Sequence, residues 1–138
     1  MEHKELRQLL DAMIRAAKVA FERTGNLLPF AMSLNDQGKI AQLALPYQAP
    51  SAEETAKATE AGLQMIAQHL TCKAVALCSE TRLNGFAVMQ VVFILEHRDR
   101  RAYRVVIPDL LDAKHWDARP TEGRFFQRTN SFSASTRW

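Results

Sequence analysis

The stretch CKAVALCSETRLNGFAVMQVVFILEHRDRRAYRVVI, residues 72–107, decides the fold. Apolar side chains alternate in three runs along it, with the period of two that is typical of strands. Asn84-Gly85 is a dipeptide that favours a two-residue type I′ turn, and the charged run around Asp99 favours a second turn. The stretch therefore predicts three consecutive antiparallel strands.

A two-residue turn at Asn84-Gly85 would fix the register of the first two of these strands. Each rung on one face would then set a small side chain against a large one, a surface suited to receive a helix. The Asn-Gly turn predicts the pairs Ala74–Leu95, Ala76–Phe93, Cys78–Val91 and, on the other face, Lys73–Glu96. A loop from Asp99 to Arg101 would place Tyr103, Val105 and Ile107 beside Phe93 and Leu95 and Arg104 opposite Glu96, giving a charged row from Lys73 to Arg104.

The sequence before this meander predicts two helices with a hairpin between them. Apolar residues recur at helical spacing through residues 3–23, and Gly25 follows as a C-cap. A strand begins near Phe30, and the letters NDQG, residues 35–38, favour a type I turn with Gly38 at a positive φ. Ser51 and Glu54 have the spacing of a capping box, which predicts a second helix over about 52–70. Close packing against the sheet would explain Gly62 inside that helix.

The element order is α-β-β-α-β-β-β, so we expect an α+β fold with a five-stranded antiparallel sheet and two long helices. This topology resembles the α/β sandwiches of the Roadblock, longin, profilin-like and GAF/PAS groups, which implies the strand order 2-1-5-4-3. The hairpin GNLLPFAMSLNDQGKI, residues 25–40, together with LEHRD at 95–99, also resembles an uncharacterised family of small bacterial proteins with a Pro-Phe-Gly/Ala hairpin. Neither resemblance implies an activity.

Composition indicates one globular domain. The chain has 138 residues, 47% of them hydrophobic and 24% charged, and no apolar run approaches the ~20 residues that cross a bilayer. The N-terminus lacks the apolar centre of a signal peptide, so we expect a cytoplasmic bacterial protein. The net charge of +3 comes from the last residues, because the first 118 are balanced. A neutral domain with a short basic tail does not favour nucleic-acid binding.

No residue pattern predicts catalysis, a metal site or a cofactor. Cys72 and Cys78 are too far apart on one strand to form a disulfide with each other, and we expect both to be buried and reduced. The predicted register makes Cys72 and His97 cross-strand neighbours, a possible nucleophile–base couple, but no third residue to orient them is evident. The other histidines, His3, His69 and His115, lack metal-ligand spacing, and we expect them at the surface.

The last residues depart from this description. We divide the chain into a single α+β domain, 1–118, and a C-terminal arm, 119–138, that is both basic and aromatic. Its aromatic side chains would each bury ~150–250 Å² if they docked, which favours anchoring through Phe125 and Phe126 on the same domain or on a second copy. We assign the arm as a hypothetical interface with these residues: Arg124, Phe125, Phe126, Arg128, Phe132 and Trp138.

Two function classes remain open. The first, which we favour, is a non-catalytic protein-interaction or dimerisation module that binds a second copy or another protein. The second is a small-molecule-binding sensor or small enzyme with a pocket between the sheet and the helices. Only Ser79 and Gln90 place polar groups within the apolar strands, which favours the first class, but an apolar pocket is not excluded.

Overall fold

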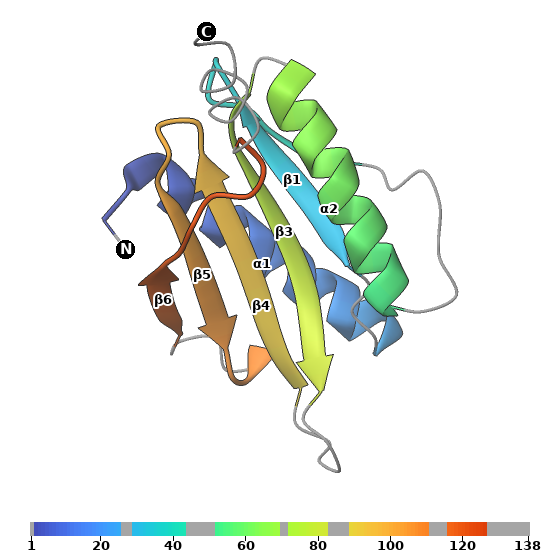
Figure 1. The fold of residues 1–138 in the computed structure, drawn as a ribbon. Coiled ribbons are helices and arrows are strands. Elements are labelled where there is room, and N and C mark those ends of the chain that lie inside the picture. The colour runs from blue at the N-terminus through green and yellow to red at the C-terminus, as the bar shows by residue number, and fades with distance from the viewer. Residues whose placement is uncertain are drawn as a thin grey trace, which may run out of the picture.

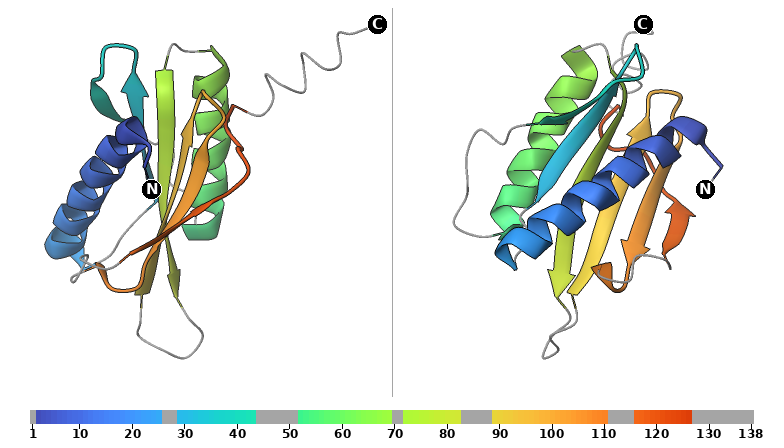
Figure 2. Two further views of the ribbon diagram at one scale, coloured as in Figure 1. Left: turned by 90° about the vertical axis from the view of Figure 1, so that its left-hand side faces the viewer. Right: turned by 180° about the vertical axis from the view of Figure 1, so that it is seen from behind.

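A computed structural model describes residues 2–25, 29–43, 52–69, 72–82, 89–110 and 116–126. One antiparallel sheet forms the middle layer, and helices α1 (Lys4–Thr24) and α2 (Ala52–His69) cover its opposite faces (Figures 1 and 2). The α+β class and the two long helices are therefore confirmed. The strands are β1 (Phe30–Asn35), β2 (Ile40–Leu43), β3 (Cys72–Arg82), β4 (Met89–His97), β5 (Ala102–Ile107) and β6 (Asp117–Pro120).

The sheet has six strands in the order β2-β1-β3-β4-β5-β6, so the expected five strands and the order 2-1-5-4-3 are both wrong. Strand β3 lies beside β1 because it is apolar on both faces: Ala74 and Ala76 face α1, while Val75 and Leu77 face α2. A strand of that composition belongs between two covered layers. Strand β6 spans the expected domain boundary at residue 118, and its four residues carry only one apolar side chain, too little for a strand pattern.

The β3–β4 register differs from the expected one by two residues. Ala76 lies opposite Leu95 and Cys78 opposite Phe93, and Glu96 faces Val75, so the predicted Lys73–Glu96 pair is not formed. A shift of two keeps every side chain on its own face, and the apolar pattern therefore cannot distinguish the two registers. The Asn84-Gly85 turn lies outside the described residues.

The β4–β5 hairpin is displaced in the same way. Its loop is Arg98–Arg100, closed by hydrogen bonds from His97 N to Arg101 O (2.9 Å) and from Arg100 N to His97 O (3.0 Å), with Arg100 at φ 78°. The loop has the odd length required, but Arg104 lies opposite Ile94 rather than Glu96. The expected faces are confirmed, because Tyr103, Val105 and Ile107 pack in the same layer as Phe93 and Leu95.

Helix α1 packs on one face of the sheet with the apolar stripe that its sequence predicts. Leu6, Leu9, Leu10 and Met13 are fully buried against β1, β3, β4 and β5. Gly25 ends the helix in the left-handed region at φ 71°, as expected of a C-cap. The predicted hairpin is also present: Asn35 Oδ1 accepts from Gln37 N and Lys39 N, and Gly38 has φ 80°.

Helix α2 forms a smaller core on the other face with Ala31, Leu63, Ala67, Cys72, Val75, Leu77 and Phe125. On the side of α2 that faces the sheet, Thr59, Leu63 and Ala67 are buried. The segment after β6 crosses β5 and β4 toward α2 and completes this layer (Figure 1). Among the described residues, no helix combines the length and apolarity that a membrane span requires.

We expect close packing against the sheet to explain Gly62 in α2, and this prediction is wrong. A Cβ built at this position would meet no heavy atom within 4 Å. The glycine therefore only weakens the helix, because it carries the largest backbone entropy cost of any residue.

We predict that Gly62→Ala raises the free energy of unfolding by about 0.5–1 kcal/mol, measured by urea denaturation. Gly38→Ala is the control and should lower it, since residue 38 has a positive φ. A destabilised Gly62→Ala protein would mean that this side of α2 is covered.

Candidate functional site

The arm is fixed to the sheet by one buried carboxylate. Glu96, on β4, is only 1% exposed and points into the layer under α2. Its oxygens accept hydrogen bonds from three consecutive backbone N–H groups, those of Arg124, Phe125 (2.9 Å) and Phe126 (2.5 Å). A buried carboxylate needs such donors, because an unpaired charge in the interior is costly.

Packing on both sides of this carboxylate sets the path of the segment. A Cβ at Gly123 would lie 2.9 Å from Glu96 Oε1, so any other residue here would require the carboxylate to shift away from its backbone donors. Phe125 is fully buried in the α2 core, and Phe126 packs partly against it. On the helix side, Gln64 Nε2 donates to Arg124 O (3.2 Å) and Arg124 pairs with Glu60 (3.2 Å).

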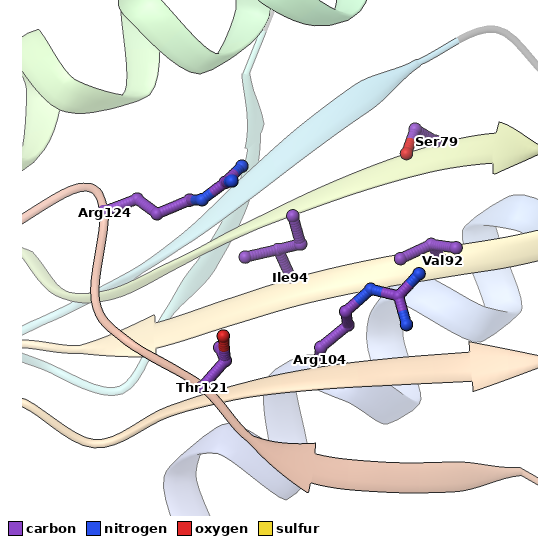
Figure 3. A pocket seen from close by; sticks show the side chains of 6 residues that line it. All are labelled: Ser79, Val92, Ile94, Arg104, Thr121 and Arg124. Carbon is purple, nitrogen blue, oxygen red and sulfur yellow. The ribbon is translucent and has the colours of Figure 1, made fainter.

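The docked segment forms one wall of a hollow over the part of the sheet that α2 leaves uncovered. The hollow measures about 270 Å³, and its floor is Val92 and Ile94 on β4 with Ser79 on β3. Figure 3 shows Arg104 from β5 and Arg124 from the segment on two sides of it, with Thr121 between them. The site thus combines an apolar floor, two guanidinium groups and two hydroxyls.

A second hollow, of about 390 Å³, lies on the other side of Arg104 toward the far end of β5 and β6. Arg104 lines both hollows, is exposed, and has no ion pair among the residues that the structure describes. Arg119 also lines the second hollow but is paired with Asp117 at 2.8 Å. Arg104 is therefore the cation of this face whose charge is not neutralised by a described neighbour. Lining residues of the second hollow are Gln90, Arg104, Val106, Pro108, Asp117 and Arg119.

A separate polar cluster joins the start of α1 to the β4–β5 hairpin. His3 and His97 are each 7% exposed, and their rings lie 4.4 Å apart. His3 Nε2 is 2.8 Å from Asp99 Oδ2, and His97 Nε2 is 3.0 Å from Glu5 Oε1. The expectation that His3 lies at the surface is wrong, because this histidine is the N-cap of α1 and accepts from Leu6 N through Nδ1 (3.4 Å).

Both carboxylates of this cluster have lowered pKa values. Hydrogen bonds from Lys73 and then His97 lower the pKa of Glu5. Partial burial acts to raise the pKa of Asp99, but hydrogen bonds from the Arg101 backbone and His3 outweigh it, and the net shift is downward. Both groups are therefore held in the ionised form that pairs with their neighbours.

The possible Cys72–His97 couple is not formed. His97 lies opposite Ala74, and the pairing of β1 with β3 passes from Leu34–Ala74 to Asn35–Cys72, an irregularity at Lys73. Cys72 consequently packs in the α2 core, whereas Lys73 reaches Glu5 on α1 at 3.1 Å. Burial raises the pKa of the Cys72 thiol, the opposite of what a nucleophile needs.

The structure brings together only part of the predicted arm interface. Arg124 is exposed at the hollow, while Phe125 is buried inside the same chain, as the anchoring hypothesis expects. Arg128, Phe132 and Trp138 lie outside the described residues. Sequence reasoning singled out Ser79 as a polar group within the apolar strands but missed Arg104 and Thr121 as its partners. A polar side chain on an alternating strand, such as Arg104, has the same pattern whether it faces solvent or a hollow, and Thr121 lies beyond the end of β6.

Comparison of the chain with protein-family models, with curated proteins and with solved structures found no match.

We predict that Glu96→Gln lowers the free energy of unfolding by about 3 kcal/mol. The amide keeps one acceptor oxygen but turns an N–H₂ group against backbone donors, and hydrogen bonds to a charged group are each worth about 1.5–3 kcal/mol. Glu122→Gln, an exposed carboxylate on the same segment, is the matched control and should change it by less than about 0.5 kcal/mol.

Trypsin cleavage of the same variants measures whether the segment around Arg124 stays docked on the sheet. Cleavage after Arg124 should be slow in the native protein and fast in Glu96→Gln, and Arg119 is protected in both because Pro120 follows it. Equal cleavage rates at Arg124 would show that the carboxylate does not hold the segment.

Proposed function

We propose that this chain is a non-catalytic interaction module that binds an acidic, partly apolar segment of another protein over the uncovered sheet face. The observation that carries the proposal is the placement of Arg104 and Arg124 on two sides of an apolar floor of Val92 and Ile94. Arg104, which has no described ion-pair partner, would pair with one carboxylate of the peptide, and Arg124 would share its guanidinium between Glu60 and a second carboxylate. An aliphatic side chain between the two carboxylates would cover the floor.

Both hollows are open to solvent, which suits a peptide rather than an enclosed small molecule. The first hollow, of about 270 Å³, is below the ~300–1,000 Å³ of ordinary ligand pockets, and the second, of about 390 Å³, is at the low end of that range. Arg104 connects the two along β5. Two shallow hollows in line, with a cation between them, suit successive side chains of an extended segment.

The residues that line the hollows also argue against an enzyme and against a protein that binds single-stranded nucleic acid. Serine, threonine and arginine in the first hollow donate hydrogen bonds, and none of its six lining residues is a carboxylate or imidazole that could act as a general base. No aromatic side chain lines either hollow, whereas single-stranded nucleic acids are bound largely by stacking on aromatic rings.

Three finer parts of the proposal rest on sequence alone. They are a cytoplasmic location, a bacterial origin and self-association of the chain. The described side chains give little support to a purely apolar dimer face, because the exposed large hydrophobic residues are Val19 and Met65, one on each helix. A second copy is therefore the lesser candidate for the occupant of the site.

We predict that a peptide of alternating Glu and Leu binds the site and that a Lys-Leu peptide does not, as measured by backbone amide shifts in NMR titrations. The shifts should gather at Ser79, Ile94 and Thr121. Arg104→Ala should weaken binding about fivefold, since an exposed ion pair is worth up to about 1 kcal/mol. Arg15→Ala is the control, because this exposed arginine lies on α1 and on the opposite face of the sheet.

The other outcomes decide against the proposal. Saturation by hexanoate as readily as by the peptide would favour the small-molecule reading. Equal weakening in Arg104→Ala and Arg15→Ala would mean nonspecific attraction, and a doubled mass in light scattering with no peptide binding would favour self-association.

A further inference from the structure

The cluster at the start of α1 has the composition of a transition-metal site. We infer that His3, His97 and Asp99 bind one divalent cation of the Zn²⁺ or Co²⁺ kind. Two imidazoles and one carboxylate suit such ions, whereas Mg²⁺ and Ca²⁺ prefer oxygen ligands alone. One ligand atom from each residue lies within 4.8 Å of the others.

The separations already resemble those of a coordination shell. Asp99 Oδ2 lies 2.8 Å from His3 Nε2 and 3.3 Å from His97 Nδ1. Ligand bonds to zinc of ~2.0–2.2 Å in a tetrahedral site place neighbouring ligand atoms roughly 3.3 Å apart. Small side-chain movements are therefore enough to admit the ion, and a fourth position stays open toward solvent on the side of Asp99, which is 32% exposed.

The surroundings supply the second shell that metal-ligating histidines need. With His97 ligating through Nδ1, its Nε2–H continues to donate to Glu5 Oε1 at 3.0 Å. Glu5 is held in turn by Lys73 Nζ at 3.1 Å. A carboxylate behind the imidazole fixes the ring and makes it a better ligand.

The ion replaces the 2.8 Å hydrogen bond between His3 Nε2 and Asp99 Oδ2, together with several longer contacts. His3 moves its single ring proton from Nε2 to Nδ1 and gives up the 3.4 Å bond from Leu6 N, and His97 Nδ1 releases Asp99 N, 3.1 Å away. Arg101 now contacts Asp99 Oδ2 at 3.1 Å, but its side chain is 62% exposed and can turn into solvent. The bound ion would link α1 to the β4–β5 hairpin.

The test uses the whole chain without a purification tag, titrated with Zn²⁺ and with Co²⁺. We expect one ion per chain by calorimetry, a melting temperature that rises with Zn²⁺ concentration, and a Co²⁺ absorption spectrum of low coordination number. Asp99→Asn should abolish all three while keeping the acceptor oxygen for Arg101 N–H, so the apo protein should melt near the wild type. Glu5→Gln should weaken the affinity about 10–100-fold.

Asp36→Asn is the matched control, since Asp36 is a carboxylate of the neighbouring hairpin paired with Arg98 and should bind metal like the wild type. Undiminished binding in both Asp99→Asn and His97→Gln would place the ion elsewhere and overturn the inference. A Co²⁺ spectrum equal to that of the hydrated ion would overturn it as well. Because none of these residues lines the hollows, failure here would leave the proposed function standing.

Discussion

The structure of the layer under α2 depends on how one buried carboxylate, that of Glu96, is hydrogen-bonded inside the protein. Glu96 has almost no contact with water, and the donors that replace water come from the backbone of residues 124–126. Without that segment the carboxylate would be buried and unpaired, and without the carboxylate three backbone N–H groups would point at an apolar layer. Each partner makes the burial of the other possible. The wall of the first hollow exists for the same reason.

The layers on the two faces of the sheet are stabilised by different interactions. The layer under α1 is a broad apolar core that draws on four strands, with its polar cluster confined to the start of the helix. The layer under α2 is smaller, and it is completed by one phenylalanine and a set of hydrogen bonds from a segment distant in sequence. The first hollow lies where this smaller layer stops and leaves the sheet uncovered.

Local patterns predicted the elements well and the pairing poorly. Both helices, the Gly25 cap, the Asn35–Gly38 turn and the faces of β4 and β5 follow from spacing alone, since each depends on neighbours in the chain. The β3–β4 register could not be predicted, because Lys73 and Glu96 suggested a pair whereas each has a distant partner, Glu5 and the backbone of 124–126. Strand β6 and the hollow share this limitation: their residues become a strand and a wall only through contacts across the sheet. His3 was misplaced because one histidine in a charged segment gives no sign of its burial.

The sheet edge formed by β6 limits edge-to-edge pairing between copies of this chain. A sheet edge offers unpaired backbone groups to any passing strand, and such pairing leads to aggregation. This edge is only four residues long, carries Asp117 and Arg119, and ends at a proline that has no N–H to donate. Few backbone hydrogen bonds are available there, and charged side chains flank them. The last strand thus terminates the sheet and disfavours its growth into a fibre.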